Sequence, residues 1–114
     1  VLAPRVDASN IGAVDAAVMD ALGPQGLLVN VARGQLVNED ALIAALKDGR
    51  LGGAALDVFW QEPTDAARWA DVPHIVLTPH GAGATDQSVA RMTAMLLDNL
   101  KAHFSGQALP TPVC

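Results

Sequence analysis

Three residues that could act together on a small carboxylic acid each follow a short β-rich run of the sequence: Arg33, Glu62 and His80. An arginine is a bidentate clamp for a carboxylate. A histidine exchanges protons near neutral pH, and a neighbouring carboxylate orients the imidazole and favours its charged form. Oxidation of a 2-hydroxy acid, or reduction of a 2-keto acid, needs these three roles together with a hydride from a cofactor.

Each of these residues also has a plainer interpretation when it is taken alone. Arg33 could be an ordinary surface charge, and Glu62 a solvated loop residue. His80 could simply cap a turn. The functional interpretation therefore depends on their shared placement, because each residue comes shortly after a predicted strand.

Three apolar, β-branched runs are too short for helices and predict the strands Leu27–Val31, Gly53–Phe59 and His74–Thr78. Asn30 is the polar exception in the first of them. Asp57 stands near the end of the second, either as a satisfied strand-end carboxylate or as a cofactor contact. In open α/β sheets, ligands bind at the carboxyl ends of the strands.

Helical patterns alternate with these strands. One helix is predicted over Val14–Leu22, with Asp15 in its first turn and Val14, Val18, Ala21 and Leu22 on the buried face. A second begins after the N-cap Asn38, and a third runs from the cap Thr85 to about Phe104. Strands that alternate with helices at this spacing predict an α/β fold with a parallel sheet.

Composition excludes several functional classes. The 114 residues are 51% hydrophobic and carry a net charge of −5 without any cluster of Lys and Arg, so we expect no nucleic-acid partner. No apolar run approaches the roughly 20 residues of a membrane span, and no signal peptide is recognisable. The single cysteine, Cys114, cannot form an internal disulfide, which favours the cytoplasm. No cluster of Cys and His suggests a metal site.

Four segments together resemble the D-isomer-specific 2-hydroxyacid dehydrogenases: LLVNVARGQLVNEDALIAAL, GRLGGAALDVF, QEP and LTPHGAGAT, in this order. The resemblance extends from about Gly23 to Val113 and is weaker before Val14. It implies that Arg33 binds the substrate carboxylate and that Glu62 supports the acid/base residue His80.

The same resemblance implies contacts with the cofactor, NAD or NADP. The strand-end carboxylate of Asp57 is expected to contact the nicotinamide carboxamide. The backbone around Val31, Ala32 and the turn from Gly81 to Gly83 is expected to line the nicotinamide end of the site.

The family resemblance also implies a larger, two-domain protein. The family's GxGxxG fingerprint is not found, and Asp86 takes the place of the third glycine after Gly81-Ala82-Gly83. We therefore expect a fragment: residues 1–84 as the second half of a Rossmann-like parallel sheet with flanking helices, and residues 85–114 as a closing helix and tail that return to a substrate domain. Such a chain should be inactive alone, expose an apolar helix face, and act at full length as a homodimer.

The function favoured by the sequence is NAD(P)-dependent reduction of a small 2-keto acid such as glyoxylate, hydroxypyruvate or pyruvate to its D-2-hydroxy acid. The WQEP loop and the ending LPTPV resemble the glyoxylate/hydroxypyruvate reductases. Two alternatives stay open. Dinucleotide-sensing corepressors of the same fold keep the three residues without catalysis. Formate oxidation uses the same scaffold, but that branch has Gln where Glu62 stands.

Overall fold

The computed structural model describes residues 1–113, so the prediction made for Cys114 lies outside the described residues. The chain divides into two compact units, Val1–Gly81 and the segment from Ala82 onward. The assignment of residues 1–84 to a nucleotide-binding domain, and of the remainder to a returning tail, stays a prediction.

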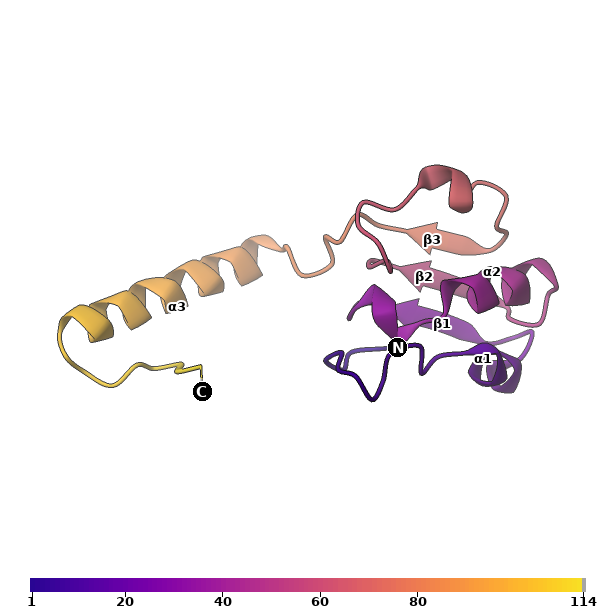
Figure 1. The fold of residues 1–114 in the computed structure, drawn as a ribbon. Helices are drawn as coiled ribbons and strands as arrows, with labels where there is room; N and C mark the ends of the chain where they lie inside the picture. Colours follow the sequence, from indigo (N-terminus) through magenta and orange to yellow (C-terminus); the bar gives the residue numbers. More distant parts are fainter. Residues whose placement is uncertain (114) are drawn as a thin grey trace. The chain divides into compact units, whose positions relative to one another are not determined.

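Three parallel strands form the sheet of the first unit, β1 (Leu27–Asn30), β2 (Gly53–Leu56) and β3 (Ile75–Leu77), in the order β1-β2-β3 (Figure 1). The register pairs Asn30 with Leu56 and Leu56 with Leu77, so the carboxyl ends of all three strands are aligned. The predicted strands are confirmed, although each is shorter than expected.

Two helices of the first unit begin at side-chain caps. In α1 (Ala16–Leu22), Asp15 is the N-cap and accepts a hydrogen bond from the Val18 amide at 3.1 Å, rather than lying inside the first turn. In α2 (Glu39–Lys47), Asn38 caps the helix as predicted, accepting from the Ala41 amide at 3.0 Å. The two helices pack against each other.

The buried face of α1 differs from the prediction. Met19 is fully buried, whereas Val18 and Leu22 are exposed. Because the Asp15 cap starts the helix at the next residue, Val14 lies outside it and pairs with Val37 in an isolated bridge. Val14 therefore does not belong to a face of this helix, and Met19 is the residue of α1 whose side chain is buried in the core.

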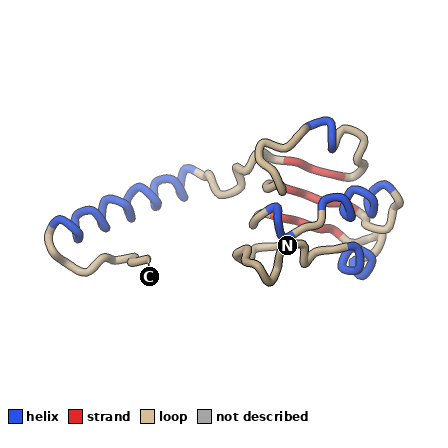
Figure 2. Tube along the Cα trace, in the orientation of Figure 1, coloured by secondary structure: helices blue, strands red, loops and turns tan. Residues whose placement is uncertain are grey.

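The core of the first unit joins both helices to the sheet, with Met19, Leu28, Leu42, Leu46 and Leu56 among its members. Most residues between β2 and β3 are loop, interrupted by the 3-10 turn η2 (Ala66–Arg68) (Figure 2). A second 3-10 turn, η1 (Gly34–Leu36), follows β1. The loops after the strands are therefore held by side chains and turns rather than by long helices.

The second unit contains α3 (Asp86–Phe104), which begins with a capping box between Thr85 and Ser88. Its exposed large apolar side chains are Val89, Met92, Met95, Leu96, Leu97, Leu100 and Phe104. The expected apolar face is thus present on this helix. Within residues 1–113, no helix is both long enough and apolar enough to cross a bilayer.

Candidate active site

The centre of the site is an imidazole–carboxylate pair between two loops. His80 Nδ1 lies 2.7 Å from Glu62 Oε2, and the other carboxylate oxygen accepts a hydrogen bond from the Phe59 amide at 3.0 Å. Since both oxygens are engaged, the carboxylate is held in one orientation. When Nδ1 donates to Glu62, Nε2 is the imidazole nitrogen that can exchange a proton with a substrate.

His80 is delivered to this pair by a tight turn directly after β3. The Thr78 amide continues the sheet by donating to the Leu56 carbonyl at 2.9 Å, and the His80 amide donates back to the Thr78 carbonyl at 3.0 Å. His80 has φ +51°, in the left-handed region that costs a non-glycine residue roughly 1 kcal/mol. The surrounding hydrogen bonds hold this conformation, which is frequent at functional positions.

Electrostatics connect all three predicted catalytic residues. The pKa of Glu62 is lowered from its ordinary 4.5, first by the hydrogen bond with His80 and next by the Phe59 amide. The charges of His80 and Arg33 lower it further. Glu62 is therefore ionised at neutral pH, and Arg33 is near enough for its charge to act on the pair.

Arg33 follows β1 in a turn that Asn30 holds from both sides. The buried Asn30 accepts a hydrogen bond from the Ala32 amide at 3.1 Å and donates one to the Arg33 carbonyl at 2.9 Å. The Arg33 guanidinium donates through Nη1 to the Ala32 carbonyl at 2.6 Å. The sequence interpretation missed the part played by Asn30, although its polar amide in an otherwise apolar strand was the available signal.

Asp57 joins the ends of β2 and β3. Its carboxylate is buried, and Oδ1 accepts hydrogen bonds from the Thr78 hydroxyl at 2.5 Å and from the Gly81 amide at 2.9 Å. The Asp57 amide donates to the Asn30 carbonyl at 3.0 Å. Asp57 thus fixes the turn that carries His80, while its contact with a nicotinamide carboxamide stays a prediction. Thr78 was not singled out from the sequence.

The other residues predicted to contact the cofactor are distributed over both units. Val31 is exposed directly after β1, and Ala32 is buried beside it. Gly81 ends the first unit, whereas Gly83 belongs to the second, where its carbonyl accepts a hydrogen bond from the Ser88 hydroxyl. An exposed apolar side chain next to a cationic turn at the carboxyl edge of the sheet fits the nicotinamide end of a cofactor beside a carboxylate.

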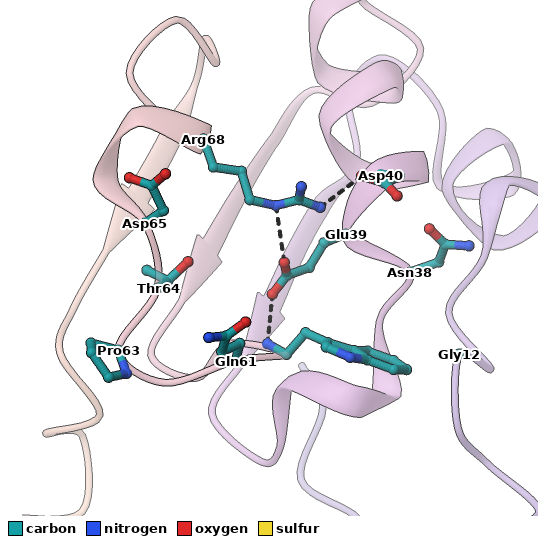
Figure 3. A pocket seen from close by; sticks show the side chains of 10 residues that line it. Gly12, Asn38, Glu39, Asp40, Gln61, Pro63, Thr64, Asp65 and Arg68 are labelled. Carbon is teal, nitrogen blue, oxygen red and sulfur yellow. Dashed lines mark hydrogen bonds and ion pairs between the residues drawn. The ribbon is translucent and has the colours of Figure 1, made fainter.

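A pocket of about 560 Å³ lies next to the loop that carries Glu62 (Figure 3). It is lined by Gly12, Asn38, Glu39, Asp40, Trp60, Gln61, Pro63, Thr64, Asp65 and Arg68. None of the three predicted catalytic residues lines it. The pocket therefore lies beside the reaction site, since its lining residues Gln61 and Pro63 flank Glu62 in the sequence, and it is not the reaction site itself.

Residues 1–82 match the family model described as the D-isomer specific 2-hydroxyacid dehydrogenase, NAD binding domain. The chain belongs to this family. It is 50% identical over 100 residues to a glyoxylate/hydroxypyruvate reductase A of Arabidopsis thaliana. This match covers 88% of this chain and 32% of the relative.

Solved structures of the family agree in fold. A 2-hydroxyacid dehydrogenase from Ketogulonicigenium vulgare matches all of this chain and 35% of its own, with 47% identity and a TM-score of 0.86. The NADPH-dependent glyoxylate/hydroxypyruvate reductase of Sinorhizobium meliloti, in complex with NADP and malonate, matches 95% of this chain and 34% of its own, with 44% identity and a TM-score of 0.84.

The chain thus spans about a third of the length of the relatives it matches. The predicted family, the Rossmann-like parallel sheet and the NAD(P) cofactor are confirmed. The roles of the individual site residues stay predictions that rest on the geometry described above.

Proposed function

We propose that the full-length protein carrying this chain reduces a small 2-keto acid to its D-2-hydroxy acid with NADH or NADPH. The observation that carries this proposal is the 2.7 Å contact between His80 Nδ1 and Glu62 Oε2, with the charge of Arg33 acting on the same carboxylate. A proton donor and its orienting carboxylate lie together at the carboxyl edge of the sheet, and Arg33 follows β1 at the same edge, where ligands bind in this architecture.

Each of the three proposed catalytic residues has a separate role. Arg33 pairs with the substrate carboxylate and so fixes the keto group relative to the sheet edge. Glu62 accepts from Nδ1 and thereby holds the imidazole in one orientation. His80 donates the proton at Nε2 to the keto oxygen as negative charge develops on it, and takes that proton back in the reverse direction.

The bound nicotinamide cofactor supplies the hydride. Val31, Ala32, Asp57 and Gly81 are the residues of the first unit that would hold its nicotinamide end, and a role for Gly83 stays a prediction from the family resemblance. The exposed apolar side chain of Val31 favours this assignment, because an aromatic ring needs an apolar surface against which to pack.

Glyoxylate and hydroxypyruvate are the substrates we favour, since reductases for these acids are among the proteins to which this chain is similar. Both acids are small and offer a carboxylate next to the carbonyl. The full-length protein is expected to be a cytoplasmic homodimer, and the 114-residue chain alone is expected to be inactive.

Steady-state kinetics of the full-length protein test the proposal with glyoxylate, hydroxypyruvate and pyruvate, each with NADH and NADPH. His80→Gln should lower kcat by about 10²-fold or more, because the proton donor is lost. Arg33→Gln should raise KM by roughly tenfold to a hundredfold, because a charge-assisted contact is worth about 1.5–3 kcal/mol.

Arg50→Gln is the matched control, since Arg50 pairs with Asp20 and precedes β2, at the opposite end of that strand from its carboxyl edge. It should leave both constants unchanged. Undiminished turnover by His80→Gln would contradict the proposed role. Tight binding of NADH without turnover of any 2-keto acid would instead favour the dinucleotide-sensing alternative.

A further inference from the structure

The loop that carries Glu62 is held by partners outside the three proposed catalytic residues. The Trp60 amide donates to Glu39 Oε1 at 2.7 Å, and the Trp60 carbonyl accepts from the Gln35 side-chain amide at 3.0 Å. Both polar groups of the Trp60 backbone are thus fixed, two residues before Glu62.

Glu39 makes this contact from the first turn of α2, where it is 9% exposed. Its second oxygen lies 3.2 Å from Arg68 Nε, and Arg68 Nη2 lies 2.7 Å from the exposed Asp40 (Figure 3). Figure 3 shows the Glu39 carboxylate between Arg68 and the backbone of the loop. A buried carboxylate that is paired on both oxygens fixes its partners, because breaking either bond leaves a buried charge uncompensated.

The hydrogen bond between Glu62 and the Phe59 amide cannot do the same work. It connects residues of one loop, so the pair would move together if the loop moved. The bond from Trp60 to Glu39 connects the loop to α2, and the bond from Gln35 connects it to the turn that follows Arg33. These two contacts tie the loop to other parts of the site.

We propose that Glu39 is a positioning residue of this active site: through the Trp60 amide it holds the loop at the place where Glu62 meets His80. The inference rests on the proposed reductase function for its kinetic consequences. Its geometric basis is independent of that function, because it concerns only how α2 holds the loop.

Glu39→Ala in the full-length protein is expected to lower kcat by about tenfold to a hundredfold, because a misplacement of about 1 Å can cost roughly 10²-fold in rate. KM for the 2-keto acid should change by less than about threefold, since Arg33 is held separately by Asn30. Asp40→Ala is the matched control. It removes a carboxylate of the same helical turn that pairs with the same Arg68, yet it leaves the Trp60 contact in place, so kcat should be unchanged.

A double-mutant cycle separates positioning from general loss of structure. If Glu39 acts through Glu62, then Glu39→Ala should lower kcat by less than about twofold in a Glu62→Gln background. Full additivity of the two losses would overturn the proposal. If Glu39→Ala does not fold, Glu39→Gln takes its place in the cycle, because its single carbonyl oxygen cannot replace both carboxylate oxygens that now accept from the Trp60 amide and from Arg68.

A measurement that needs no turnover distinguishes failure of this proposal from failure of the proposed function. Carbon-13 NMR of the Glu62 carboxyl should show its pKa moving up toward the ordinary 4.5 in Glu39→Ala and not in Asp40→Ala. If the wild-type protein reduces no 2-keto acid but this shift appears, only the reductase function fails. If Glu62 titrates identically in the wild type and in Glu39→Ala, the positioning role is wrong.

Discussion

The most demanding prediction concerns Gly34, which brings the turn after Arg33 into contact with the loop that carries Glu62. A Cβ placed on Gly34 would lie 1.9 Å from the Phe59 carbonyl carbon, 2.0 Å from its oxygen and 2.4 Å from the Trp60 nitrogen. These are backbone atoms, so no side chain can rotate away. Gly34→Ala must therefore push the two segments apart.

The size of the effect follows from that geometry. The nearest contact has to open from 1.9 Å to at least 3.4 Å before it becomes an ordinary van der Waals distance. An opening of that size strains the bond from Gln35 to the Trp60 carbonyl, and overpacking of a buried site costs up to about 3 kcal/mol. For a unit of this size, 3 kcal/mol corresponds to a fall in Tm of about 12 °C or more.

Thermal unfolding of the chain, followed by circular dichroism, measures this cost. Gly81→Ala is the control, because a Cβ there meets nothing within 4 Å, and its Tm should change little. Amide hydrogen exchange should also show faster exchange at Trp60 in Gly34→Ala. A Gly34→Ala chain with the wild-type Tm and unchanged protection at Trp60 would refute the close-approach argument.

Three further predictions test the core and the site. Met19→Ala should destabilise the chain by about 2–5 kcal/mol in urea unfolding, whereas Val18→Ala on the exposed side of α1 should change it by less than about 0.5 kcal/mol. Because the pKa of Glu62 is lowered from its ordinary 4.5, its ionised form stabilises the fold above that pH, and this stabilisation is lost as pH falls through the folded-state pKa. His80→Ala should therefore lose less free energy of unfolding on acidification than the wild type. Equal losses in the two proteins would contradict the prediction. Asn30→Ala leaves two backbone groups without their partner and should lower the free energy of unfolding by about 2 kcal/mol or more in the same urea assay. A change near zero would show that the turn carrying Arg33 does not need the Asn30 side chain.

The secondary structure was largely accessible from local patterns. Short apolar runs gave the three strands, and the caps Asn38 and Thr85 gave the starts of α2 and α3. These signals are local, because a side chain bonds to a backbone group three residues away. The exception is α1, where the predicted helix began two residues too early and the buried face was assigned without Met19.

Contacts between segments far apart in the sequence could not be predicted from local patterns. The pairing of Asp57 with the Gly81 amide and of Glu39 with the Trp60 amide spans 24 and 21 residues, respectively. Nothing in the neighbouring sequence distinguishes Glu39 from other acidic residues in a first helical turn. Only the packing of α2 against the loop shows that its carboxylate is buried and engaged on both sides.

The sequence by itself determined the α/β alternation, the family and the three polar residues that follow consecutive strands, because these depend on residue type and spacing along the chain. The tertiary structure decided that His80 and Glu62 lie within 2.7 Å of each other and that Arg33 acts on the same carboxylate. The tertiary structure also decided that Asn30 and Asp57 bond to the turns that follow the strands. It likewise decided that Glu39 bonds to the loop between β2 and β3. Parallel strands bring their carboxyl ends to one edge, so residues far apart in sequence become neighbours only once the sheet has formed.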